Sequence, residues 1–328
     1  MIPVSFVILL VLGAEFVNGW TDAPNSIATV VSTRVLSPFQ ALAMATVLNA
    51  LGAMSGTAVA ATIGKGIVQS DVINLATVAA AMVGIIFFST LAWYYGLPTS
   101  ESHALVAGLT GAALAKAGPS AVLWEGWSKV GIGLLFSTFL GFFGGLAIMG
   151  SLYRLLGNTP PGTVRRYFGR LQILSAAFMA FSHGSNDGQK FIGAFALTLL
   201  LGGVFPEFHI PFWVIILCAL TMAIGTAIGG WRIVRTMGIK ITRLEPVHGF
   251  AAETGAAMTI ELASRLGIPL STTHTISTTI MGVGAIRRLS AVRWGVTLEI
   301  VSAWILTFPV CGAIGWLVTK VWMLLTSG

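Results

Sequence analysis

The sequence predicts an all-α polytopic membrane protein built from two inverted-topology repeats of about five passes each. Three observations lead to this fold class. The chain of 328 residues is 55% hydrophobic and only 9% charged, whereas a soluble domain carries roughly 25% charged residues. The mean hydropathy is +0.89, and about ten apolar segments approach the roughly 20 residues that a spanning helix needs. Finally, three polar motifs recur in the same order in both halves of the chain.

The first apolar segment, MIPVSFVILLVLGAEF, is expected to be a membrane helix. It has no basic residue ahead of its apolar run and no small-residue cleavage site, and it continues directly into a polar motif. Cys218 and Cys311 lie in other apolar runs, which indicates core positions and says nothing about the redox compartment. The net charge of +7 comes from basic residues in short loops between apolar segments, a membrane pattern that does not indicate nucleic-acid binding.

Three motifs define the duplication. Each motif of the first half has a counterpart displaced by about half of the chain: NGWTDAPN and HGSNDGQK at 18–25 and 183–190, a Gly-Thr pair at 56–57 and 225–226, and PTSESH and PLSTTH at 98–103 and 269–274. One such match could arise by chance, but three in the same order indicate an internal repeat.

The distribution of Lys and Arg predicts how the repeats are inserted, because these residues are enriched in cytoplasmic loops. They concentrate in the central loop, after the apolar segment 211–231 and before the last apolar segment. These three places share one side if five passes separate the central loop from the C-terminus. Since five is odd, the halves have opposite orientations, with both termini extracytoplasmic. The predicted units are a first repeat at 1–156, a cytoplasmic linker at 157–170 and a second, inverted repeat at 171–328.

The polar motifs predict helix starts at membrane depth. The segments 23–36 and 187–202 are short and begin with Asp, Gly, Pro or Asn, which break or cap helices. We expect them to be re-entrant half-helices meeting at the midplane, because irregular backbone survives there only when it is buried in protein or lines a wet cavity. PTSESH and PLSTTH should also open helices, with Pro at the start and hydroxyls in the first turn. Four helix N-termini would then converge.

This arrangement predicts a site that binds an oxyanion together with a cation. Helix N-termini carry partial positive charge and free N–H groups, and carboxylate and amide oxygens suit a small cation. Each ion lowers the cost of burying the other. The predicted anion-binding residues are Asn25, Ser26, Ser100, Ser102, Gln189, Lys190, Ser271, Thr272 and Thr273. The predicted ligands of the coupling cation are Asn18, Asp22, Asn186 and Asp187.

Four further ionisable residues are candidates for coupling or gating: Glu101, His103, Glu253 and His274. The repeat-related histidines, and His183 with them, are also interpreted as structural residues that donate to nearby backbone. The hypothesis of an ion-binding site rests mainly on Asp22 and Asp187, because an ionisable group inside a membrane is functional by default.

The sequence resembles a known family at these same motifs. NGWTDAPNSIATVVSTR and HGSNDGQKFIG resemble the two copies of the signature of the inorganic phosphate transporter (PiT) family, and PTSESH and PLSTTH resemble its second repeated motif. The resemblance covers nearly the whole chain. It makes Asp22 and Asp187 the signature aspartates and pairs Asn25 with Lys190, a departure from the family pattern that leaves the number of coupling cations open.

The resemblance implies a secondary transporter and no enzyme: a symporter that moves inorganic phosphate with sodium or protons by alternating access. It also implies a homodimer embedded in the lipid of the plasma membrane, with no cofactor besides the coupling cation, Na⁺ or H⁺. A carrier of sulfate or another oxyanion with the same fold is an alternative.

Two other functional classes fit parts of the pattern. An intramembrane aspartyl protease would use Asp22 and Asp187 as a dyad that shares one proton, but GWTD and SNDG lack the expected Gly-x-Gly-Asp context and Lys190 would disturb the shared proton. An anion channel would have similar neutral linings in both halves, whereas two acids and one lysine predict a charged, saturable site. No Gly-x-Ser-x-Gly, His-Glu-x-x-His or Gly-x-x-x-x-Gly-Lys motif occurs.

Overall fold

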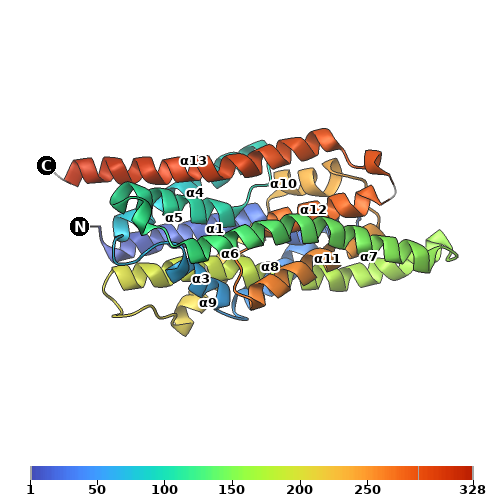
Figure 1. The fold of residues 1–328 in the computed structure, drawn as a ribbon. Helices are drawn as coiled ribbons and strands as arrows, with labels where there is room; N and C mark the ends of the chain where they lie inside the picture. Colours follow the sequence, from blue (N-terminus) through green and yellow to red (C-terminus); the bar gives the residue numbers. More distant parts are fainter. Residues whose placement is uncertain (1, 287, 327–328) are drawn as a thin grey trace.

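The computed structural model describes residues 2–286 and 288–326, and within these ranges the chain is helical apart from short connections and one isolated antiparallel bridge between Val68 and Val122. The long helices lie roughly along one common direction and form an elongated bundle (Figure 1). This confirms the all-α prediction. Met1 and residues 327–328, the chain ends whose side of the membrane the sequence predicts, lie outside the described residues.

The two halves contain the same kinds of elements in the same order. The first half comprises α1 (Val4–Ser32), α2 (Pro38–Ala53), α3 (Ala58–Gly66), α4 (Leu75–Tyr95), α5 (Glu101–Ala117), the 3₁₀ turn Pro119–Ala121, α6 (Trp124–Leu135), the π-helical turn Phe136–Leu140 and α7 (Gly141–Leu156). The second half comprises α8 (Pro161–Leu201), α9 (Phe212–Ile228), α10 (Trp231–Arg235), the π-helical turn Thr236–Lys240, α11 (Pro246–Arg265), α12 (Thr272–Ala285), the 3₁₀ turn Leu289–Ala291 and α13 (Trp294–Thr326). In both, a long helix precedes a bent pair, a helix of about 20 residues, a short helix and a final long rod.

Four helices in the described part of the chain are long and apolar enough to cross a membrane, or up to six if each bent pair is one span. The bends are 66° between α2 and α3 and 61° between α9 and the helix that follows it. This number is smaller than the about ten apolar segments of the sequence for two reasons. Polar and charged residues lower the hydropathy of α8 and α11. Helices α5 and α12 have only 17 and 14 residues, too few to cross a hydrocarbon core of roughly 30 Å at about 1.5 Å per residue.

The structure corrects the predicted half-helices at 23–36 and 187–202. Helix α1 continues through Pro24, and α8 is one helix of 41 residues, so neither segment begins a new helix. The glycines of the motifs serve close packing instead. A Cβ on Gly19 would lie 2.3 Å from the carbonyl oxygen of Met222 in α9, and one on Gly184 would lie 2.0 Å from that of Asn49 in α2. Small residues allow such backbone contact between membrane helices.

Helices α5 and α12 are the elements that begin inside the bundle. Ser100 and Ser271 cap them through hydroxyl oxygens that accept from the backbone N–H of His103 and His274, at 3.3 and 3.1 Å. The prediction that PTSESH and PLSTTH open helices is therefore confirmed. Two helix N-termini meet near the middle, in place of the four expected: α5 and α12 extend toward opposite ends of the bundle (Figure 1).

The hydrophobic core is split into two clusters. On α1, Val7–Ala14 belong to one cluster and Ile27–Val30 to the other. On α8, 191–199 and 168–180 are divided in the same way. The residues between these stretches, 15–26 and 181–190, are where both helices carry their polar motifs. The bundle therefore has a polar layer between two apolar cores.

The chain reverses direction between its halves at one end of the bundle. Helix α8 begins at Pro161 directly after α7, so only 157–160 connect them and much of the expected linker is helical. The first residues of α1 and the last residues of α13 lie at the other end (Figure 1).

Candidate functional site

The candidate site lies in the polar layer, where α1 and α8 pass the first turns of α5 and α12. The side chains of Asp22, Asp187 and Lys190 are only 3%, 1% and 1% exposed. Burying a charge is costly unless it is paired and hydrogen-bonded. The partners of these three residues therefore indicate what the layer can bind.

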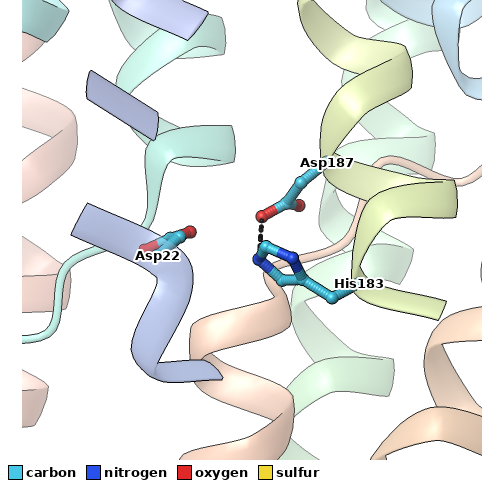
Figure 2. Close-up of side chains that lie close together, drawn as sticks. All are labelled: Asp22, His183 and Asp187. Atoms are coloured by element: carbon cyan, nitrogen blue, oxygen red, sulfur yellow. Dashed lines mark ion pairs between the residues drawn. The ribbon is translucent and has the colours of Figure 1, made fainter. Parts of the chain in front are cut away.

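The two aspartates reach one common point from the two halves of the chain. Figure 2 shows Asp22 on α1 facing Asp187 on α8, with His183 beside them. One ligand atom from each of these three residues lies within 4.8 Å of the other two. The expectation that Asp22 and Asp187 come together deep in the bundle thus holds in the structure.

Asp187 is held by residues from two elements. His183 and Lys190 precede and follow it by four and three residues, so that all three share one face of α8. The Nε2 atom of His183 lies 3.1 Å from Oδ2, and the Lys190 ammonium contacts Oδ1. From the start of α12, the hydroxyl of Thr272 donates to Oδ2 at 2.8 Å. This carboxylate therefore has a full positive charge and a hydroxyl donor beside it.

Asp22 has weaker partners. The hydroxyl of Thr273 lies 3.3 and 3.4 Å from its two carboxylate oxygens. The amide nitrogen of Asn25 donates to the hydroxyls of Thr272 and Thr273, at 3.2 and 2.9 Å. The first turn of α12 thus connects both aspartates, one through each threonine.

Lys190 joins the starts of the two short helices. Besides Asp187, its ammonium donates to the Ser102 hydroxyl in α5 and, at 2.8 Å, to the carbonyl oxygen of Leu270 just before α12. Ser102 itself donates to the same carbonyl at 2.9 Å. Both N-termini are therefore fixed to α8 at the level of Asp187.

The layer also contains oxygen atoms suited to a small cation. Among the described residues, buried side-chain oxygens without a hydrogen-bond partner include Glu15 Oε1, Asn18 Oδ1, Asn25 Oδ1 and Asn186 Oδ1. Such an oxygen is costly to bury. Amide and carboxylate oxygens of this kind, like those of the Asp22 carboxylate, are the ligand type that a hard cation such as Na⁺ prefers.

Other predicted site residues make contacts between helices. Ser26 donates to Asn49 Oδ1 at 3.4 Å. Gln189 accepts from the backbone of Val59 at 3.0 Å and donates to that of Ser185. Asn186 donates to Ser264 and Ile268 at 3.0 and 3.2 Å, and Asn18 donates to Glu15 at 3.3 Å. None of these bonds involves either aspartate, so ligand roles for these four residues remain predictions.

Glu101 and Glu253 are buried carboxyls with several donors each. Glu101 accepts from Thr21, next to Asp22, at 3.0 Å and from Ser89 in α4. Glu253 accepts from Thr29 at 2.5 Å, from Gln172 at 3.0 Å and from Ser175. Glu101 therefore neighbours the Asp22 side of the layer, whereas Glu253 links α11 to α1 and α8.

The prediction that His103 and His274 donate to nearby backbone is wrong. The rings contact each other edge to face, with centroids 4.7 Å apart, and His274 stacks on Trp304 at 3.7 Å. Within the described residues, none of their four ring nitrogens has a hydrogen-bond partner. The helix starts are capped by serine hydroxyls, so the rings are free to pack among aromatic side chains.

Sequence reasoning missed three residues of the layer. His183 was interpreted as structural, yet its ring joins Asp187 to the amide oxygen of Asn49, which lies 3.2 Å from Nδ1. The four-residue spacing to Asp187 was the available indication. Asn49 lies in the apolar second half of α2, and Glu15 lies one turn before Asn18. Polar residues inside apolar segments are the general sign of such positions.

Comparisons with known proteins identify the family. The model of the phosphate transporter family matches residues 18–163 and again 157–315. The chain belongs to the phosphate transporter family. This confirms the resemblance read from the two motif pairs.

Relatives in this family cover almost the entire chain. A protein of Rhizobium meliloti named "Probable low-affinity inorganic phosphate transporter" is 45% identical over 94% of this chain and 92% of its own length. One of the same name from Bacillus subtilis is 36% identical over 96% of both chains. A solved structure described as "The sodium-dependent phosphate transporter" superimposes with a TM-score of 0.82 at 27% identity, covering 98% of this chain and 99% of that one. This phosphate transporter family member is a multi-pass membrane transport protein, as the sequence predicts, and its relatives are named as transporters and not as enzymes.

Proposed function

We propose that the protein is a symporter that carries inorganic phosphate across the plasma membrane by alternating access, driven by a sodium or proton gradient. The observation that carries the proposal is the meeting of Asp22 and Asp187, from opposite halves of the chain, in a buried polar layer. The name of the solved relative favours sodium as the coupling ion.

Phosphate would bind at the two helix starts. The first turns of α5 and α12 offer backbone N–H groups and the hydroxyls of Ser102, Thr272 and Thr273, which are neutral donors suited to an oxyanion. Asp22 would hold the cation, because a carboxylate next to a bound anion requires a positive charge between them. Phosphate and cation would therefore stabilise each other's binding.

The closed layer supports a carrier rather than a channel. The site residues are buried, while a cavity of about 230 Å³ reaches Ser185 and Gln189 from one side, between the α2–α3 bend and α11. We propose that 1–156 and 171–328 are inverted repeats whose rearrangement opens the layer to each side in turn. The homodimer implied by the family resemblance, and the extracytoplasmic termini, stay predictions.

The test is uptake of labelled phosphate into liposomes with imposed sodium or proton gradients, with sulfate as a second substrate. Asp22→Asn and Asp187→Asn should abolish counterflow of labelled phosphate while the protein still reaches the membrane. Asp71→Asn, the same change at an exposed loop residue, should transport normally. Full counterflow by both site variants would contradict the proposal. Uptake of sulfate in preference to phosphate would show that sulfate, and not phosphate, is the substrate.

A further inference from the structure

The ammonium of Lys190 lies in a cage of oxygen atoms. Its three contacts are a carboxylate oxygen of Asp187, the hydroxyl of Ser102 and the carbonyl of Leu270. An ammonium has three N–H donors, so each one has an oxygen partner and none remains for another ligand in this conformation. Carboxylate, hydroxyl and carbonyl oxygens are also the ligands of hard cations such as sodium. The ammonium therefore stands where a metal cation bound to Asp187 would stand.

The first half of the chain has no such charge at the corresponding position. Asn25 aligns with Lys190 in the repeated motif and donates only to Thr272 and Thr273. Within the described residues, no lysine or arginine forms an ion pair with Asp22. Among the residues that the structure describes, the side-chain oxygens of Asn18 and Asn25 have no hydrogen-bond partner. The two aspartates therefore differ in charge compensation: Asp187 is paired with the cationic side chain of Lys190, and Asp22 has no such ion pair among the described residues.

We propose that Lys190 is a built-in counter-cation that replaces one exchangeable coupling cation, so that only the Asp22 side of the layer binds a cation from solution. The inference rests on the proposed symport function and deepens it. It assigns Lys190 to the cation side of the site, whereas the sequence predicted contact with phosphate. The Asp187–Lys190 pair stays neutral throughout the transport cycle, and the number of cations moved per phosphate is one smaller than with asparagine at both positions.

The decisive variant is Lys190→Asn, which restores the amide of the first-half motif. Removal of the ammonium leaves the Asp187 carboxylate uncompensated among the hydroxyl of Ser102, the carbonyl of Leu270 and a new amide oxygen. These atoms should then bind Na⁺. In detergent, the thermal midpoint of Lys190→Asn should rise with NaCl relative to choline chloride more steeply than that of the unchanged protein.

The transport readout is the gradient at which net phosphate flux reverses in liposomes. At reversal, the ratio of phosphate concentrations across the membrane depends on a power of the ratio of sodium concentrations. For Lys190→Asn this exponent should be one larger than for the unchanged protein, whether sodium or protons drive the unchanged protein. The double variant Asp187→Asn/Lys190→Asn, which lacks both charges, is read out in detergent, where its thermal midpoint should lose the added sodium dependence. Lys65→Asn, at an exposed lysine, should behave as the unchanged protein.

Two results would overturn the inference: an unchanged exponent in a transporting Lys190→Asn variant, or failure of this variant to fold even at high sodium concentration. Failure of the proposed function is a separate outcome. If the unchanged protein takes up no phosphate under any gradient, symport is rejected, while the sodium-dependent stability of Lys190→Asn in detergent still decides whether the cage accepts a cation.

Discussion

At the scale of single residues, the layer is organised by hydroxyls that bridge the two halves. Thr272 donates to Asp187, Thr273 contacts Asp22, and Asn25 bonds to both threonines. All of these residues are buried in the bundle, where water does not replace a lost hydrogen bond. The side chains of adjacent threonines on one helix therefore determine how both carboxylates are positioned.

Valine at either position should weaken transport, because it keeps the shape of threonine and removes the hydroxyl. A buried carboxylate oxygen that loses a donor costs about 1–3 kcal/mol, so Thr272→Val and Thr273→Val should each lower phosphate uptake by about 5- to 150-fold. Initial rates of labelled phosphate uptake into liposomes measure the effect. Thr319→Val is the matched control, since this buried hydroxyl has no partner among the described residues. Equal uptake by all three variants would show that the bridging hydroxyls are dispensable.

The aspartates and hydroxyls could be found from the sequence, whereas the residues that position them could not. Two repeated motifs contain Asp22, Asp187, Thr272 and Thr273. A polar motif that recurs in both halves of an apolar chain indicates a functional site. Asn49 repeats nothing, and its role depends on α2 packing against α8, which sequence spacing does not reveal. Such contacts are set by tertiary structure, so they emerge only once the helices are placed.

At the scale of elements, glycines and helix starts determine how closely the polar motifs approach. Sequence reasoning interpreted Gly, Pro and Asp around Asp22 and Asp187 as helix breakers, but both helices continue through them. In lipid a broken helix exposes unpaired backbone groups, and glycine also serves close packing. Composition alone does not distinguish these two uses. The serine-capped starts of α5 and α12 were predictable because capping is local.

Gly184→Ala tests the packing role of glycine. The added Cβ would lie 2.0 Å from the carbonyl oxygen of Asn49, so α2 and α8 must separate, and overpacking of this kind costs about 1–3 kcal/mol or more. We expect a lower thermal unfolding midpoint in detergent and loss of phosphate uptake. Gly131→Ala in α6 meets nothing within 4 Å and should stabilise by about 0.5–1 kcal/mol through helix propensity. A Gly184→Ala variant as stable as Gly131→Ala would contradict the close approach of these helices.

At the scale of the whole molecule, the order of elements is the same in the two halves, and the polar layer divides the core between two apolar clusters. The inference of duplication came from three short motifs, and one of them, the Gly-Thr pair at 56–57 and 225–226, lies between α2 and α3 and in the last turn of α9, at the bends of the two helix pairs with similar angles. The size of these bends could not be predicted from hydropathy. Hydropathy indicates which segments are apolar enough to lie in lipid, but it gives no angle between consecutive helices.

Opposite insertion of the halves can be tested with single cysteines and a maleimide that does not cross membranes. Cys218 and Cys311 are both buried, so the unchanged protein should give little background labelling. Positions 71 and 207, between α3 and α4 and between α8 and α9, are exposed, as is position 158 in the turn between the halves. If the repeats are inverted with the central turn inside the cell, Asp71→Cys and Glu207→Cys should label in intact cells, and Asn158→Cys only after the membrane is opened. Each variant must also take up phosphate, which shows that its topology is native. Labelling of Asn158→Cys in intact cells, or protection of either of the other two, would reverse the orientation derived from the basic residues or rule out inverted insertion of the second half.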